Sequence, residues 1–156
     1  MLTIRAALPH DLTVIHQLIG ELADFEQLRE QMVGSIEDLR RHLFDEPRFA
    51  HAIIAEWDGQ PAGFALYFFN YSTFLCRPGL YLEDLFVRTV FRKRAIGHAL
   101  LSALEQRARE LGCGRLEWAV LNWNQSAIDF YRRFGAYPKD GWTLYRKDLL
   151  DATRTP

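Results

Sequence analysis

The stretch LYLEDLFV, residues 80–87, constrains the fold more than any other part of the sequence. It is apolar at nearly every position, apart from the adjacent pair Glu83 and Asp84. A strand that is apolar on both faces is typical of the interior of a sheet that is covered on both sides. The stretch therefore predicts a central strand of a layered α/β domain, and it places two carboxylates within that strand.

A helix and a second strand follow this stretch. Apolar residues recur at the spacing of one buried helical face at Ile96, Leu100, Leu101, Leu104 and Ala108. Residues 115–121, RLEWAVL, then have the composition of another strand. Two neighbouring strands joined by a helix run parallel through a right-handed crossover. We therefore expect a parallel pair in the middle of the sheet.

The rest of the chain alternates strand and helix patterns. Strand patterns cover residues 2–7, 49–57, 61–71 and 141–149, and helical patterns begin at residues 9–12, at Ser35 and within residues 122–136. Ser35 with an acid three residues later forms a capping box. The order predicts one α/β domain over residues 1–156, with a mixed, mostly antiparallel sheet, about four helices and a frayed C-terminal end.

Composition excludes several classes of protein. The formal net charge of −1 argues against a general nucleic-acid binder, which usually carries a basic excess. No run approaches the roughly 18 apolar residues of a membrane span, and no apolar signal core opens the chain. The five histidines are scattered and the two cysteines form no C-x-x-C pair. We expect a cytoplasmic protein without metal, nucleic-acid or membrane partners.

The segment FRKRAIGHALL, residues 91–101, sets Arg92, Lys93 and Arg94 before a predicted helix. The helix dipole disfavours cations at that end. A short basic turn between a strand and a helix N-terminus instead suits an anion. The spacing is R-x-x-A-x-G, with Ala95 and Gly97, and differs from the P-loop and Rossmann spacings. The alternative is a solvated basic turn.

Three further features have both a functional and a structural interpretation. Buried without partners, Glu83 and Asp84 would cost several kcal/mol each, so they either serve a site or form a strand-end salt bridge. Glu26 falls on the apolar face of the first helix or lies solvated beyond its end. Asn124 and Tyr131 share a helix edge with a small residue, although a lone tyrosine is more often a core aromatic.

Together these features resemble one family. The segments YLEDLFVRTVFRKRAIGHALL, LNWNQSAIDFYRRFGA and GWTLYRKD are similar to the GNAT superfamily of acetyl-CoA-dependent N-acetyltransferases. The diamine (spermidine/spermine) branch and its thialysine relatives are the most similar, and LIGELADFEQL and YFFNYST extend the resemblance over nearly the whole chain. It implies an enzyme that transfers an acetyl group directly from acetyl-CoA to a primary amine.

The resemblance implies a role for each matching residue. Glu83 would accept the proton of the amine, directly or through water, and Tyr131 would protonate the departing thiolate. Phe25, Glu26, Glu83 and Asp84 would bind a small cationic amine. Acetyl-CoA would contact the splayed strand, the basic turn and the later helix at Leu85, Phe86, Val87, Arg92, Lys93, Arg94, Ala95, Ile96, Gly97, His98, Asn124 and Arg133. The resemblance also implies a homodimer.

The sequence departs from the family pattern at several positions. Ala95 and Lys93 stand where the family commonly has glycine, and Ala at a positive φ would cost about 1 kcal/mol. Ser72 and Phe74 replace the acid and tryptophan typical of polyamine enzymes. These changes favour a lysine-like amine, thialysine or a diamine as substrate. They leave open a protein lysine or N-terminal acetyltransferase, and a non-catalytic acyl-CoA sensor.

Overall fold

The computed structural model describes residues 1–150, which form two compact units, residues 1–119 and the residues from Val120 onward. The strands of the first unit are β1 (Leu2–Ala6), β2 (His51–Trp57), β3 (Gln60–Ser72), β4 (Arg77–Val87) and β5 (Arg115–Trp118). Its α-helices are α1 (Leu12–Phe25), α2 (Ile36–Phe44) and α3 (Ile96–Glu110). The second unit contains α4 (Gln125–Arg133).

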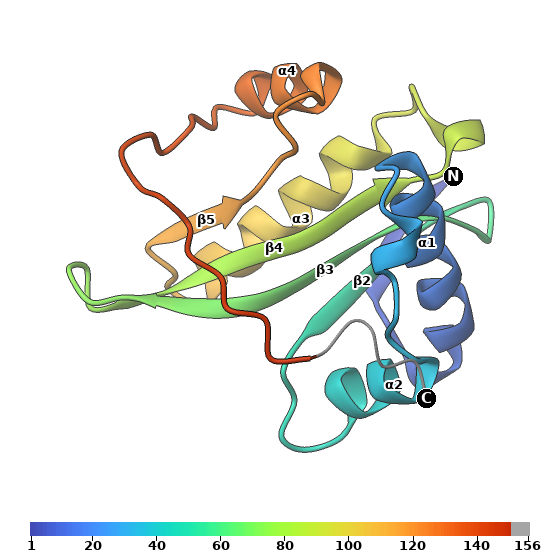
Figure 1. The fold of residues 1–156 in the computed structure, drawn as a ribbon. Coiled ribbons are helices and arrows are strands. Elements are labelled where there is room, and N and C mark those ends of the chain that lie inside the picture. The colour runs from blue at the N-terminus through green and yellow to red at the C-terminus, as the bar shows by residue number, and fades with distance from the viewer. Residues whose placement is uncertain (151–156) are drawn as a thin grey trace. The chain divides into compact units, whose positions relative to one another are not determined.

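The five strands lie in the order β1-β2-β3-β4-β5 within one sheet (Figure 1). The first four pair antiparallel, and β4 pairs parallel with β5 over Gly79 to Leu82. This arrangement confirms the predicted mixed sheet and its parallel pair. The pair lies at one edge of the sheet rather than in its middle, because β5 is the last of the five strands and residues 141–149 add none beyond it. The β2–β3 hairpin turns at Asp58 and Gly59, which both have a positive φ, as the DG sequence favours.

Helices cover both faces of the sheet (Figure 1). α1 and α2 lie on one face, where Ile15, Leu18 and Leu43 pack against the inner strands and Phe86. α3 lies on the other face and buries the apolar stripe that the sequence predicts, including Leu100 and Leu104. The strand β4 is therefore covered from both sides, which explains its continuous apolar composition.

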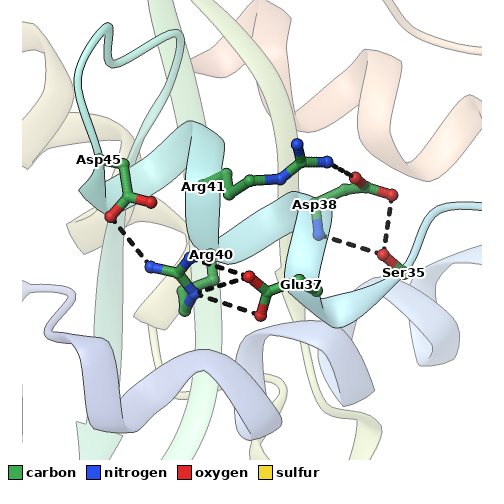
Figure 2. Close-up of polar contacts among 6 residues, drawn as sticks. All are labelled: Ser35, Glu37, Asp38, Arg40, Arg41 and Asp45. Carbon is green, nitrogen blue, oxygen red and sulfur yellow. Dashed lines mark hydrogen bonds and ion pairs between the residues drawn. The ribbon is translucent and has the colours of Figure 1, made fainter.

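The N-terminus of α2 is capped as the sequence predicts (Figure 2). The Ser35 side chain accepts a hydrogen bond from the Asp38 backbone N–H. Two acids, Glu37 and Asp38, lie in the first turn, where they oppose the positive end of the helix dipole. Glu37 also forms an ion pair with Arg40, and Asp38 with Arg41. The acids at this helix N-terminus are therefore paired within the helix itself.

One predicted element is wrong. Residues 141–149 form no strand and take no place in the five-stranded sheet. Large apolar side chains in this segment are mostly exposed, Trp142 at 80% and Tyr145 at 90%. Alternating apolar residues show that a segment can line a sheet, but a strand also needs a free partner edge at the right register. The prediction of a frayed end falls largely on residues 151–156, outside the described residues.

The strand β5 is shorter than the predicted strand at residues 115–121, because it ends at Trp118. Within residues 1–150, no helix has the length and apolar composition needed to cross a membrane.

Candidate functional site

A β-bulge lies in the middle of β4. Leu66 pairs with Asp84 and Tyr67 pairs with Leu82, so Glu83 is an extra residue with no partner of its own. Bulges of this kind redirect side chains next to functional sites. Leu82 and Tyr67 face α3, whereas Asp84 lies with Leu66 on the face covered by α1. The bulge therefore shifts the alternation of β4 side chains between the two faces of the sheet. The shift occurs at Glu83 and Asp84.

The bulge gathers acidic side chains on the α1 face. Burial, followed by the charges of Glu83 and Glu26, raises the pKa of Asp84 to about 6. Glu26 follows directly after α1, and burial raises its pKa as well. Glu83 lies near Tyr81, whose phenol pKa is raised by burial and then by the charge of Glu83.

We call Glu26, Glu83 and Asp84 the acidic group. Among residues 1–150, none of the three carboxylates forms an ion pair or a side-chain hydrogen bond. The alternative of a strand-end salt bridge is therefore not what the structure contains. Glu26 is partly buried rather than fully solvated, although the helix ends at Phe25. Negative charge without internal partners is the condition expected for binding a cation.

The outer edge of β4 opens next to this group. The pairing of β4 with β5 stops at Leu82, while β4 continues to Val87 and stays paired with β3. Within residues 1–119, the edge of β4 beyond Leu82 has no strand partner. The splay that the family resemblance implies is therefore present, and it begins at the bulge.

Alternation along β4 shows which backbone groups face this open edge. Arg88 donates its backbone N–H to the Ala62 carbonyl at 2.9 Å, so that group points toward β3. Successive residues of an antiparallel strand alternate between the two sides. Leu85 and Val87 therefore direct their N–H groups outward, whereas Phe86 directs its own toward β3. Of these three residues, Leu85 and Val87 present their backbone N–H groups at the open edge, and Phe86 does not.

The basic turn holds its arginines against aromatic rings. Arg92 donates from Nε to the Val87 carbonyl at 3.2 Å, and its guanidinium lies 4.7 Å from the centre of the Phe25 ring. Arg94 lies 4.7 Å from the Trp57 ring centre. Such cation–π contacts contribute about 0.5–1 kcal/mol at exposed sites. The two arginines are therefore held beside the helix end despite the opposing dipole.

The backbone of the turn is strained at two positions. Lys93 has φ 63° and Ala95 has φ 58°, both in the left-handed region that glycine occupies without cost. These are the two positions where the family commonly has glycine. The cost anticipated from the sequence is therefore present in the structure.

The N-terminus of α3 differs from that of α2, whose side-chain cap is drawn in Figure 2. Ala95 provides no side-chain cap, and the first turn of α3 contains no acid. Ile96 is buried, so that residue offers a ligand only its backbone. His98 is exposed and its Nδ1 lies 3.3 Å from the Ser102 hydroxyl. An uncapped helix end beside three cations suits the pyrophosphate of acetyl-CoA.

The remaining predicted residues lie in the second unit. Asn124 caps α4 by accepting a hydrogen bond from the Ala127 backbone N–H at 3.2 Å. Tyr131 is partly buried, and its ring centre lies 5.4 Å from that of Phe130. Arg133 is exposed at the end of the helix. The predicted helix is present. The shared edge of Asn124 and Tyr131 and their catalytic and cofactor roles stay predictions.

One anchor of the site has no signal in the sequence. Arg88 follows β4 directly and binds the Glu21 carboxylate of α1 through Nε and Nη2, at 2.9–3.1 Å. It also donates to the Pro61 carbonyl at 3.0 Å. This bidentate contact fixes the end of β4 to α1. A pair separated by 67 residues follows no local periodicity, so the sequence alone could not reveal it.

Comparison with known proteins agrees with this geometry. Residues 16–136 match the acetyltransferase (GNAT) family. The chain is 38% identical to a thialysine N-epsilon-acetyltransferase from Bos taurus, over 92% of this chain and 90% of that protein. It is 31% identical to an L-ornithine N5-acetyltransferase from Arabidopsis thaliana, over 92% of this chain and 82% of that protein.

Solved structures show the same fold. An integron cassette protein from the mobile metagenome of V. cholerae superposes with a TM-score of 0.79 at 26% identity, covering 94% of this chain and 92% of that one. The chain belongs to the GNAT family of acetyltransferases, and it is an N-acetyltransferase.

The family uses acetyl-CoA as its donor, and the described residues fit that molecule. The uncapped end of α3 and the cations of the turn match a pyrophosphate. The open edge at Leu85 and Val87 matches an extended chain with amide groups, because its outward backbone groups have no strand partner. Among residues 1–150, no three histidine, cysteine, aspartate or glutamate side chains gather as a metal-binding group.

Proposed function

We propose that this protein transfers the acetyl group of acetyl-CoA to the primary amine of a small cationic substrate, with a lysine-like amino acid or a diamine as acceptor. The observation that carries the proposal is the acidic group beside the open edge of β4. A substrate cation held by Glu26 and Asp84 would lie next to the backbone donors of Leu85 and Val87. The acceptor and the donor then meet at one edge of one strand.

The acidic group also suits the proton transfer. A primary amine has a pKa near 10.4, so its reactive neutral form is scarce at neutral pH. A carboxylate must take that proton, directly or through water, and Glu83 is the candidate because it is exposed at the bulge. One of the outward N–H groups, of Leu85 or Val87, stabilises negative charge on the acyl oxygen, a contribution of about 3 kcal/mol for that donor. The two N–H groups lie roughly 6–7 Å apart along the strand, so the other is available to the extended chain of the cofactor.

Acetyl-CoA supplies the acyl group as a thioester with a thiolate leaving group. Tyr131 is the candidate to hydrogen bond that sulfur. A tyrosine with a pKa near 10 is a weaker acid than a thiol near 8.5, so full proton transfer would be uphill by about 2 kcal/mol. Tyr131 therefore acts as a hydrogen-bond donor as charge develops on the sulfur.

The β3–β4 hairpin argues for a lysine-like acceptor over a long polyamine. Ser72 is buried and accepts the Leu75 backbone N–H, and Phe74 is 97% exposed at the tip. The hairpin therefore adds no carboxylate for a further ammonium group at these two positions. The thialysine and ornithine enzymes named above act on amino acids with a terminal amine, which supports the same choice.

A thiol-release assay tests the proposal. Purified protein and acetyl-CoA are incubated with lysine, thialysine, ornithine, putrescine, spermidine and a lysine-containing peptide, and free thiol is followed. We expect the amino acids or the diamine to give the highest kcat/KM. Release only with the peptide would support a protein acetyltransferase instead. Binding of acetyl-CoA without thiol release from any amine would support the acyl-CoA sensor. The homodimer and the cytoplasmic location stay predictions.

A further inference from the structure

A cavity of about 440 Å³ lies in the first unit, around strands β1, β2 and β3. Its walls come from the end of β1, the end of α2, the start of β2 and the second half of α3. Glu83, Asp84 and the open edge lie on β4, and Glu26 follows α1. None of these residues lines the cavity, so the cavity is a separate site. Its volume falls within the range of about 300–1,000 Å³ that is typical of small-molecule sites.

The lining combines an apolar floor with a cationic rim. Leu43, Phe44, Ile53 and Leu104 supply apolar surface, and Tyr67 stacks on His51 with ring centres 5.3 Å apart. Arg48 and Arg107 line the same space. A floor of this kind suits an apolar body, and a guanidinium rim suits an anionic group, because arginine forms paired hydrogen bonds with carboxylate and phosphate oxygens.

The positive charge of this rim is poorly neutralised within the protein. Arg48 forms no ion pair or side-chain hydrogen bond with any of residues 1–150. Arg107 has only a long contact, at 3.9 Å, to Glu110. The Glu110 carboxylate also lines the cavity, and it accepts a hydrogen bond from Gln106 at 3.0 Å. Arg5 also lines the cavity, but two carboxylates already neutralise it, Asp11 at 2.7 Å and Glu56 at 2.6 Å. Two arginines therefore remain available to a ligand.

His51 shows that the fields of these two arginines overlap. Burial lowers the pKa of His51, and the charges of Arg48 and Arg107 lower it further. Both guanidinium groups therefore act on the same half-buried ring from different elements, one from the segment after α2 and one from α3. The C-terminal end of the α3 dipole opposes an anion by less than about 1 kcal/mol, which two arginines outweigh.

We propose that this cavity is a second ligand site, which binds a small organic anion carrying a carboxylate or phosphate on an apolar body. Arg48 and Arg107 hold the anionic group, and the floor at Phe44 and Leu104 holds the apolar part. The site is independent of the acetyl-transfer reaction. Since α3 begins at the basic turn and ends at this cavity, a ligand here contacts the same helix that the cofactor turn precedes.

Binding of matched aromatic probes tests this site. Benzoate and phenyl phosphate are titrated into the acetyl-CoA-saturated protein by calorimetry, with benzamide and benzylamine as neutral and cationic analogues. We expect saturable binding of the two anions and none of the analogues. The Arg48→Gln/Arg107→Gln variant should bind the anions at least about 10-fold more weakly. The preferred anion identifies which headgroup the site takes.

Arg109→Gln is the matched control, because Arg109 lies on the same helix, is exposed and pairs with Glu105. It should bind the anions as the unaltered protein does. Thermal melting and acetyl-CoA affinity of each variant establish that the fold and the cofactor site are intact. The proposal is overturned if neither anion binds, if Arg109→Gln weakens binding as much as the double variant, or if benzamide binds equally well.

Discussion

At the scale of single residues, Asp84 shows a conflict between stability and binding. Its carboxyl is partly buried without a cationic partner, and its pKa rises from an ordinary 3.8 to about 6. The folded protein therefore favours the protonated form. The protonated Asp84 carboxyl stabilises the folded state fully below pH 3.8, and this stabilisation is lost as the pH rises through about 6. Above that pH the charge destabilises the folded state by up to about 3 kcal/mol.

Asp84→Asn should therefore stabilise the free protein at neutral and alkaline pH. We expect the free energy of unfolding to rise by about 1–3 kcal/mol near pH 8, with the gain vanishing as the pH falls to about 4. Urea unfolding across this range measures it. The same variant should raise KM for the amine, because a ligand cation loses its partner. Asp148→Asn, at an exposed position, is the control. A gain that does not depend on pH would contradict this account of Asp84.

At the scale of elements, the turn before α3 keeps a strained backbone where glycine would relax it. Ala95→Gly should raise the free energy of unfolding by about 0.5–1 kcal/mol, because the left-handed conformation costs Ala about 1 kcal/mol or more and Gly little. The melting temperature should rise by about 2–4 °C. Ala99→Gly is the matched control, because Ala99 lies inside α3, where glycine is destabilising by about 1 kcal/mol. Destabilisation by both changes would show that residue 95 is not left-handed in solution.

Features that depend on residues close together in the chain could be predicted from the sequence. Features that depend on contacts with distant parts of the chain could not. Ser35 caps α2 through an atom three residues away, so its signal is local. The bulge at Glu83 depends on the register of β3, and Arg92 meets a ring 67 residues earlier in the chain, at Phe25. The strand predicted at residues 141–149 was wrong for the same reason, because the apolar pattern could not reveal whether a sheet edge was available for pairing.

At the scale of the molecule, the separation of positive and negative charge affects substrate binding more than the net charge does. The formal net charge is −1, which alone would weakly repel acetyl-CoA and scarcely attract an amine. The structure instead places the basic turn at the start of α3, and it places the acidic group at the bulge of β4 and at the end of α1. Local fields of opposite sign raise the concentration of each substrate at its own part of the site.

Salt should therefore weaken the binding of both substrates. Between about 50 and 500 mM NaCl the Debye length falls from roughly 14 to 4 Å, and we expect KM for acetyl-CoA and for the amine each to rise about 3- to 10-fold. The rate constant kcat should change much less, because the bound groups are shielded from salt. Initial rates at varied ionic strength measure both constants, and sucrose in place of salt controls for viscosity and water activity. If KM for acetyl-CoA stays constant while KM for the amine rises, the basic turn does not attract the cofactor. Binding there would then depend on the uncapped helix end and the backbone of β4 alone.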